Sequence, residues 1–169
     1  MSGVTVRGAQ LADLGAMRAI FNHYVERSSA TFRTVLETEA ERRAWFDARN
    51  ERYPALAAES EGEVIGWASL SPWKATGGYR HTVELSVYLR EDACGKGLGK
   101  QLLAGLIERG RAAGHHVMIG GACTEQTASV RLHLAMGFTQ VAHLREVGFK
   151  FGRWLDVAYF EKVLAPPGT

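Results

Sequence analysis

Residues 82–106 read TVELSVYLREDACGKGLGKQLLAGL, and this stretch decides the fold that the sequence predicts. Its first eight residues place apolar side chains at Val83, Leu85, Val87 and Leu89, which is the alternation of a β-strand. A short charged turn follows, then three glycines at alternate positions, and an apolar helical stripe begins among them. The stretch therefore predicts a strand, a bare loop and a helix start in direct succession.

The three glycines, Gly95, Gly97 and Gly99, predict a binding site for a diphosphate. Glycine lets main-chain amides approach an anion without a Cβ in the way, and the positive end of a helix dipole adds attraction. A P-loop is excluded, because Gly99-Lys100 is followed by Gln101 where Ser or Thr would hold magnesium. A Rossmann loop is excluded because the spelling is Gly-x-Gly-x-Gly rather than Gly-x-Gly-x-x-Gly. The alternative is a glycine-rich turn that only joins the strand to the helix.

Composition predicts a single globular domain. The chain has 169 residues, 46% of them apolar and 22% charged. No apolar run reaches the roughly 20 residues that span a bilayer, and the N-terminus lacks a signal-peptide pattern, so no membrane association is expected. The net charge of +2, with bases scattered among acids, argues against a nucleic-acid partner. Cys94 and Cys123 have neither metal nor disulfide spacing, so the cytoplasm is the expected location. We expect one domain over residues 1–165 and a flexible tail at 166–169.

Periodicity and capping residues predict the order strand, helix, helix, three strands, helix, strand, helix, two strands. Asp13 is the expected cap of the first helix, and Thr38 with Glu41 forms a capping box for a second helix that runs to about Tyr53. Residues 60–62 (SEG) are typical of a hairpin turn. The predicted strands cover residues 4–7, 55–59, 63–70, 82–89, 117–123, 138–143 and 155–163.

The glycine loop resembles the acetyl-CoA loop of the GCN5-related N-acetyltransferase (GNAT) superfamily, Arg/Gln-x-x-Gly-x-Gly/Ala. Gly97-Leu98-Gly99 fills its second half, whereas Cys94 stands where Arg or Gln is usual. The order of predicted elements is also that of the superfamily. The resemblance implies an α/β (α+β) GNAT fold, a central mixed, mostly antiparallel twisted sheet of about six to seven strands with about four helices. It also implies acetyl-CoA as co-substrate.

Further segments resemble phosphinothricin acetyltransferases and their relatives that acetylate methionine sulfone or methionine sulfoximine. They are residues 21–25 (FNHYV) leading to 29–32 (SATF), 79–84 (YRHTVE), 86–88 (SVY), 128–133 (ASVRLH) and 148–156 (GFKFGRWLD). The resemblance implies direct transfer of acetyl, in a ternary complex, to the α-amine of a small amino-acid analogue. One departure is Gln126, which stands where the family usually has an Asn that contacts the pantetheine.

Glu84 is the candidate general base. N-acetylation needs a neutral amine, and an α-amine is partly or mostly protonated at neutral pH. Alternation puts Glu84 on the strand face shared with Ser86 and Tyr88, and the resemblance places a catalytic glutamate here. The alternative is an ordinary solvent-facing glutamate. A water could carry the proton, because a carboxylate near pKa ~4 is a poor direct base unless burial raises its pKa.

His133 is the second catalytic candidate. Many members of the superfamily have at this helix position a Tyr that protonates the departing thiolate, and the phosphinothricin branch has His. A thiol with a pKa near ~8.5 needs little acid assistance. His133 could therefore orient the sulfur, assist Glu84, or simply pack against Phe138, and the sequence leaves these roles open.

The resemblance assigns cofactor-binding residues along the strand and the loop. Main-chain groups of the strand would pair with the pantetheine as an added strand does, where the strand separates from its neighbour after Ser86. The loop amides would hold the pyrophosphate. The candidates are Val87, Tyr88, Leu89, Gly95, Lys96, Gly97, Leu98, Gly99, Lys100 and Gln126. The histidines lack metal-ligand spacing, so no metal is expected.

The resemblance also implies a pocket for an acceptor with an oxygen-rich tetrahedral side group. Arg80 and Lys150 are the expected cations, with Lys74 a weaker choice, since Arg grips a carboxylate through two hydrogen bonds. Aromatic side chains would wall the methylene chain. The substrate-binding candidates are Phe32, Trp73, Arg80, Lys150 and Trp154. The family implies a homodimer in which Lys150 and Trp154 act across the interface.

Two other functions remain open from the sequence. One is a GNAT enzyme for a protein N-terminus, a polyamine or another small amine, although such cationic acceptors favour an acidic pocket. The other is a non-catalytic module that binds coenzyme A. The presence of both Glu84 and His133 argues against a module that only senses the cofactor, because such a module needs neither side chain.

Overall fold

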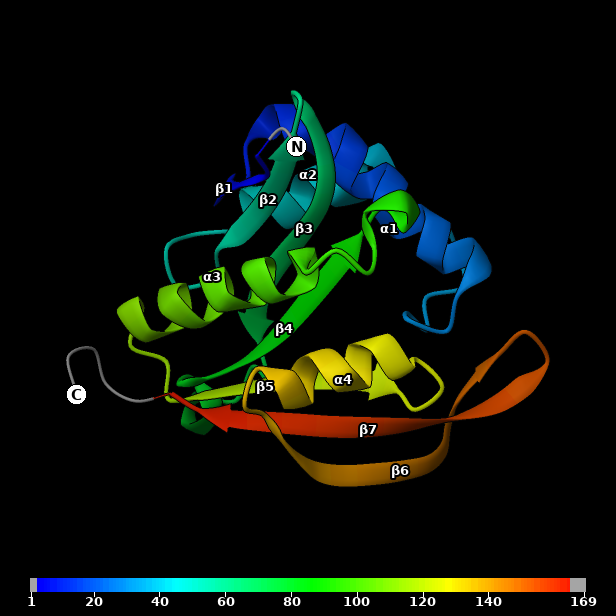
Figure 1. Ribbon diagram of the computed structural model, residues 1–169. Helices are drawn as coiled ribbons and strands as arrows, with labels where there is room; N and C mark the ends of the chain where they lie inside the picture. The colour runs from blue at the N-terminus through cyan, green and yellow to red at the C-terminus, as the bar shows by residue number, and fades with distance from the viewer. Residues whose placement is uncertain (1–2, 165–169) are drawn as a thin grey trace.

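The computed structural model describes residues 3–164 and contains one seven-stranded sheet (Figure 1). The expected tail at 166–169 lies outside the described residues. The strands are β1 (Thr5–Gly8), β2 (Ala55–Ser60), β3 (Glu63–Pro72), β4 (Thr82–Leu89), β5 (Val117–Cys123), β6 (Thr139–Lys150) and β7 (Arg153–Val163). The α-helices are α1 (Leu14–Arg27), α2 (Glu39–Asp47), α3 (Leu98–Ala112) and α4 (Thr127–Ala135). Their order confirms the order predicted from the sequence.

The strands lie in the order β1-β2-β3-β4-β5-β7-β6, and every neighbouring pair is antiparallel except β4 with β5. The mixed, mostly antiparallel sheet expected from the resemblance is therefore confirmed. The parallel pair follows from the chain path, because α3 crosses over between β4 and β5 and returns the chain to the same end of the sheet.

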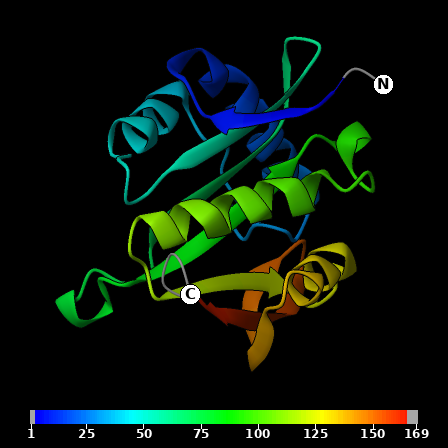
Figure 2. The ribbon, with the colours of Figure 1, turned by 60° about the vertical axis from the view of Figure 1, so that its left-hand side comes forward.

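The helices cover both faces of the sheet (Figures 1 and 2). α3 packs on one face through Leu102, Leu103 and Leu106, none of which has exposed surface, and α4 lies on the same side. α1 covers the other face, where Met17 and Ile20 pack with Trp67 of β3. Alternation along β4 therefore turns its odd-numbered side chains toward α3 and its even-numbered ones toward α1.

Local geometry confirms the turn and one cap that the sequence predicted. Glu61 and Gly62 both have positive φ, at 53° and 82°, which joins β2 to β3 in a two-residue hairpin. Thr38 accepts from the amide of Glu41, and the Glu41 carboxylate accepts from the amide of Thr38, so the capping box is present.

Two expectations about helix ends were wrong. The second helix ends at Asp47 rather than near Tyr53, because Asn50 turns the chain by accepting from the amides of Arg52 and Tyr53. Asp13 precedes α1 but makes no side-chain cap. Its carboxylate is taken instead by the Arg7 guanidinium, at 2.7 and 2.9 Å.

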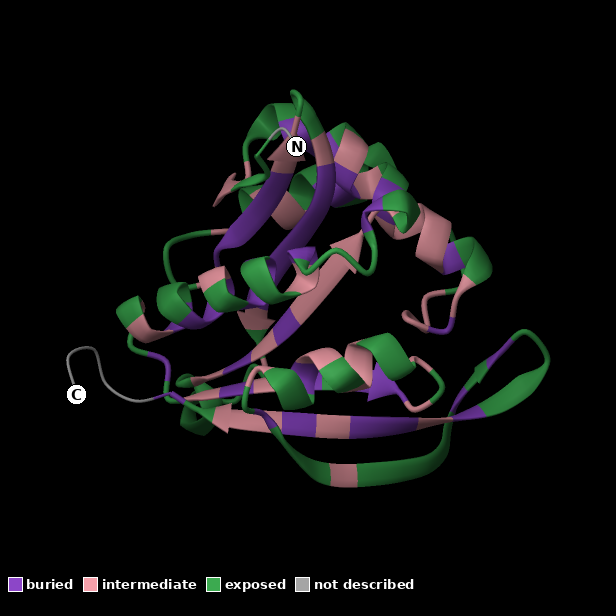
Figure 3. Ribbon diagram, viewed as in Figure 1, coloured by how far each residue is buried: buried purple, intermediate pink, exposed green. Residues whose placement is uncertain are grey.

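Burial distinguishes the packed body of the molecule from the mostly exposed strand β6 (Figure 3). β2 and β3 are buried along most of their length, whereas β6 is exposed at most positions. β6 extends from Thr139 to Lys150, well past the predicted end at 143, and forms an edge of the sheet. Among residues 3–164 no helix is both long and apolar enough to cross a membrane.

Candidate active site

β4 and β5 separate in the middle of the sheet. Their parallel pairing covers only three residue pairs and ends at Glu84 with Ile119, although β4 continues to Leu89 and β5 to Cys123. Figure 1 shows the two strands diverging from this point. The separation begins two residues before the expected position, Ser86. The second half of β4 therefore presents an edge that no other strand covers on the β5 side.

The glycine loop lies at the end of this open edge and leads into α3. Gly95 and Gly97 have φ of +74° and +81°, a region that favours glycine, and Gly97 is the N-cap of α3 without a side-chain cap. A Cβ at either glycine would meet no atom within 4 Å, so both face open space. Within the described chain, no acceptor is found for the main-chain amides of residues 95–100. This row of free amides at the start of a 15-residue helix suits a phosphate group.

The three polar side chains expected to bind the cofactor differ in whether they have hydrogen-bond partners in the protein. Lys96 and Lys100 are exposed. Gln126, the N-cap of α4, donates from Nε2 to the hydroxyls of Ser28 (3.3 Å) and Ser29 (2.9 Å). The Gln126 side chain, one methylene longer than Asn, thus connects the end of β5 with the segment after α1 through these hydrogen bonds. Only its amide oxygen remains available for a ligand.

Glu84 lies at the point where β4 and β5 separate, on the sheet face covered by α1. It is half-buried, and no hydrogen bond or ion pair to its carboxylate is found among residues 3–164. Burial raises its pKa above the ordinary glutamate value. A carboxylate with a raised pKa and no partner in the protein can accept a proton from a bound amine or water.

Tyr88 is on the same face of β4, four residues after Glu84, and its side chain packs between the sheet and α1. Its ring lies 5.0 Å from the Trp67 ring and 5.2 Å from the Phe21 ring, centroid to centroid. Burial raises its pKa to about 12. Its side chain therefore secures β4 against α1, which leaves only its main chain for the expected cofactor contact.

His133 is buried beneath α4, with 3% of its surface exposed. Its Nδ1 donates to the carbonyl oxygen of Ser129 at 2.7 Å, and its Nε2 is buried without a hydrogen-bond partner. The ring stacks on Phe160, with centroids 5.0 Å apart, and meets Phe138 edge-on. Burial lowers the pKa of His133, so the ring is a neutral imidazole whose bare nitrogen faces Gly120.

The three aromatic side chains expected to line the acceptor pocket lie in different parts of the structure. Phe32 lies on Gly148 of β6, where a Cβ would overlap its ring. Trp73 follows β3 and meets the ring of Tyr159 edge-on, with centroids 5.5 Å apart. Trp154 is 64% exposed on the β6–β7 hairpin and pairs with Phe149 at 4.7 Å. Trp73 thus belongs to the face that carries Glu84, whereas Trp154 lies away from it.

Of the expected cations, Lys150 has a different task. It is 4% exposed, and its ammonium donates to three main-chain carbonyls, those of Tyr24 (3.2 Å), Ser28 (2.6 Å) and Thr31 (2.8 Å). All three of its hydrogens are occupied, so no donor remains for the carboxylate of an acceptor bound to the same protomer. Burial lowers its pKa, and its charge serves the carbonyl end of α1.

Arg80 and Lys74 lie outside the buried part of the site. Arg80 is exposed just before β4 and donates from Nε to Nε2 of His81 at 2.9 Å. The ammonium of Lys74 lies over the rings of Trp73 (5.9 Å) and Tyr79 (5.4 Å). Both cations retain donors that a ligand could use.

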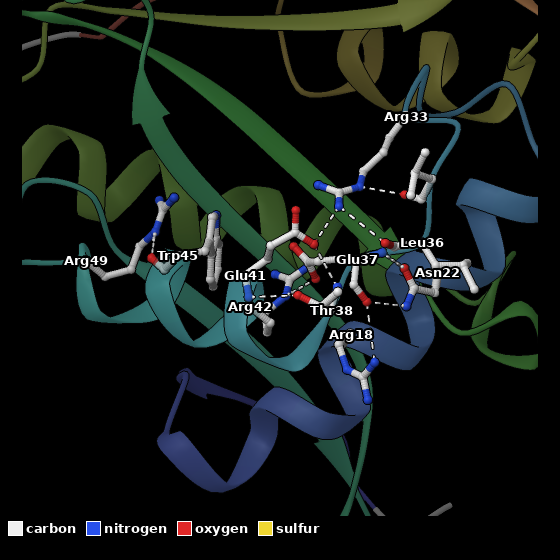
Figure 4. Close-up of polar contacts among 11 residues, drawn as sticks. Arg18, Asn22, Arg33, Leu36, Glu37, Thr38, Glu41, Arg42, Trp45 and Arg49 are labelled. Atoms are coloured by element: carbon white, nitrogen blue, oxygen red, sulfur yellow. Dashed lines mark hydrogen bonds and ion pairs between the residues drawn. The ribbon is translucent and has the colours of Figure 1, made fainter.

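The segment between α1 and α2 borders the site and is fixed by polar side chains (Figure 4). Asn22 exchanges two hydrogen bonds with the main chain of Glu37, and the Glu37 carboxylate pairs with buried Arg42 at 2.6 Å. At the other end of the segment, Glu125 accepts from Ser29 and, through two hydrogen bonds, from Arg153. The segment has no helix or strand of its own, so these contacts determine its position.

Two residues of this region were missed by sequence reasoning, Tyr159 and Glu125. Tyr159 reads as one more aromatic in a strand, and Glu125 as an acid in a turn. For Tyr159 the sequence offers one signal, the two adjacent glycines of β5, which indicate that bulky side chains pack closely on this strand. Gly121 leaves room for the ring of Tyr159, and Gly120 leaves room for His133.

Comparisons with known proteins agree with this geometry. The sequence model described as the acetyltransferase (GNAT) family matches residues 17–138. The chain is 45% identical over 164 residues to the L-methionine sulfoximine/L-methionine sulfone acetyltransferase of Pseudomonas paraeruginosa, covering 96% of this chain and 95% of the relative. It is 39% identical over 170 residues to the phosphinothricin N-acetyltransferase of Streptomyces viridochromogenes, covering 97% and 91% of the two chains.

A solved structure shares the fold. An acetyltransferase of Salmonella typhimurium, determined with its cofactor acetyl-CoA, superimposes with a TM-score of 0.94 at 41% sequence identity. The match covers 98% of this chain and 96% of that chain.

Proposed function

The chain belongs to the acetyltransferase (GNAT) family and is an acetyl-CoA-dependent N-acetyltransferase, and we propose that its acceptor is the α-amine of a small amino-acid analogue. The relatives named for methionine sulfoximine, methionine sulfone and phosphinothricin support this class of acceptor. The observation on which the proposal depends is the unpaired carboxylate of Glu84 at the point where β4 and β5 separate.

The free amides of residues 95–100 would hold the diphosphate of the coenzyme. The uncovered edge of β4, at Val87, Tyr88 and Leu89, would pair with its pantetheine arm, together with the amide oxygen of Gln126. The thioester supplies the acetyl group when the coenzyme is bound. The fit is supported by the free amides of the loop and by the side of β4 that no strand covers, although the carbonyl of Leu89 on this strand already accepts a hydrogen bond from the Tyr24 hydroxyl (2.6 Å).

Glu84 would remove the proton of the acceptor amine, directly or through a water. Its raised pKa makes it a stronger base than an exposed glutamate, and it has no protein cation to hold its charge. We assign His133 to packing rather than proton transfer, because its donor nitrogen is bound to Ser129 and its other nitrogen faces the backbone of β5.

We further propose that two copies of the chain form a homodimer through the β6–β7 hairpin. β6 is a long edge strand, which proteins normally cover or blunt. The hairpin carries a set of exposed apolar side chains, here called the hairpin apolar surface: Val141, Leu144, Val147, Phe149, Phe151 and Trp154. In this dimer Trp154 would contribute to the acceptor site of the partner, as the family resemblance implies.

We also propose a domain extent and a cellular location for the chain. Residues 1–165 form one N-acetyltransferase domain, which the single continuous sheet supports. The protein acts in the cytoplasm, which its free cysteines, Cys94 and Cys123, support. Nucleic acid and membranes are not partners in this account.

An assay of thiol release from acetyl-CoA tests the proposed function. L-Methionine sulfone, L-methionine sulfoximine and phosphinothricin are compared with spermidine and with a peptide that has a free N-terminus. The expected result is turnover of at least one amino-acid analogue well above that of spermidine or the peptide. Preference for spermidine or the peptide would assign another acceptor, and coenzyme binding without turnover of any amine would indicate a binding module.

A further inference from the structure

Tyr159 lies on the same face of the sheet as Glu84. Glu84 pairs with Ile119 of β5, and two residues further along β5 Gly121 pairs with Tyr159 of β7. Paired residues project to the same face, and so do residues two apart in one strand. The carboxylate and the phenol therefore face the same space, where β4 and β5 diverge.

The ring of Tyr159 has a defined seat. A Cβ at Gly121 would come within 3.1 Å of Cε1, so the ring lies directly on the bare backbone of β5. Trp73 meets it edge-on at 5.5 Å, and the amide of Trp73 donates to the carbonyl of Thr82 at the start of β4 (3.3 Å). Trp73 and Tyr159 therefore make a rigid aromatic corner near Glu84.

The hydroxyl of Tyr159 has no hydrogen-bond partner among residues 3–164, although the side chain is half-buried. Burial raises its pKa, and the charge of Glu84 raises it further, so the phenol keeps its proton and has one hydrogen to donate. The carboxylates of Glu84 and of Glu161, which pairs with Ile119 from β7, can accept on this face, and the phenol of Tyr159 can donate there.

The distance between β4 and β7 determines which part of the acceptor the Tyr159 hydroxyl can reach. β7 is two strands from β4, and strands lie about 4.8 Å apart, so the two main chains are separated by about 10 Å or more where β4 diverges. A group bonded to the carbon that carries the amine stays close to Glu84. A polar group several bonds further along an acceptor is the one that can approach Tyr159.

We propose that Tyr159 is a specificity-determining residue, whose hydroxyl donates a hydrogen bond to an oxygen on the distal side group of the acceptor while Glu84 receives its amine. The inference rests on the proposed function and names the feature of the acceptor that the site selects, an oxygen-rich group several bonds from the amine. The face of Trp73 covers the carbons between the two ends.

The test compares Tyr159→Phe with wild type on L-methionine sulfone and on L-methionine, which differ only in the two sulfone oxygens. For the sulfone, the variant is expected to lose about tenfold in kcat/KM, mostly through KM, the effect of one lost hydrogen bond. For methionine it is expected to change little, so the preference between the two acceptors falls about tenfold. Tyr53→Phe, a half-buried tyrosine stacked on His115, is the matched control and should change neither value.

Binding measurements separate this inference from the proposed function. Calorimetry of L-methionine sulfone in the presence of coenzyme A should show weaker binding to Tyr159→Phe, with unchanged affinity for acetyl-CoA and an unchanged melting temperature. Equal losses on both acceptors, or none on the sulfone, would overturn the role of Tyr159 while wild-type turnover still supported the proposed function. If the wild type neither binds nor acetylates the sulfone, the role of Tyr159 is overturned, and the proposed function fails with it only when methionine sulfoximine and phosphinothricin are not acetylated either.

Discussion

The imidazole of His133 lies directly on the backbone of Gly120, so that a Cβ at this glycine would overlap its Nε2. The adjacent glycine, Gly121, carries the ring of Tyr159 on the opposite face of β5. Two consecutive glycines thus accommodate two rings, one under α4 and one facing the site. A strand with two glycines is intrinsically weak, and here the packing of the rings accounts for them.

Gly120→Ala should destabilise the protein much more than Gly121→Ala. His133 is fixed between Phe138 and Phe160 and cannot move away, and overpacking of a core costs about 1–3 kcal/mol. Tyr159 is half-buried and needs to shift by only a few tenths of an ångström. Urea unfolding of the two variants provides the measurement, and equal losses would show that His133 is not held as described.

Lys150→Met should lower the free energy of unfolding by about 2–4 kcal/mol, because three main-chain carbonyls lose the buried ammonium that donates to them. Lys74→Met, at an exposed lysine, is the control and should be close to neutral. If Lys150 instead gripped the acceptor carboxylate, the variant would keep its stability and raise only the KM of the acceptor. Chemical denaturation together with acceptor kinetics distinguishes the two cases.

The pH dependence of kcat/KM should show an acid limb set by Glu84. The carboxylate acts as a base only when ionised, so the rate falls as the pH falls through its pKa. Since burial raises that pKa, the midpoint should lie above the usual glutamate value of about 4.3. A profile measured with saturating acetyl-CoA tests this, and a midpoint at or below 4.3 would contradict a buried base.

Replacing an aromatic residue of the hairpin apolar surface should break the dimer. Trp154→Ser removes a side chain that is 64% exposed in the single chain, and Val35→Ser removes a 70% exposed one outside the hairpin. Sedimentation velocity at micromolar concentration should show a dimer for wild type and Val35→Ser but a monomer for Trp154→Ser. A monomeric wild type would remove the proposed interface.

The features that could be predicted from the sequence are those indicated by short local patterns. Alternation in β4, the glycine loop and the capping box at Thr38 lie within short stretches, so the order of elements and the position of Glu84 could be predicted. The task of Lys150 could not be, because its partner Tyr24 is 126 residues away in the chain. Tyr159 was missed for the same reason, since its proximity to Glu84 depends on β7 pairing beside β5.

The most direct test of the account is Glu84→Gln, assayed for acetyl-CoA binding by calorimetry and for acetyl transfer to the best acceptor. Gln keeps the size of the side chain and removes its basicity, and it should not weaken the fold. Because the pKa of Glu84 is raised by burial, its protonated form favours the folded state, and this contribution to stability is present at low pH and lost as the pH rises through that pKa. The neutral side chain of Gln therefore should not lower the stability at neutral pH. We expect unchanged affinity for acetyl-CoA and a loss of kcat of at least about 100-fold. Turnover equal to that of wild type would contradict this role of Glu84.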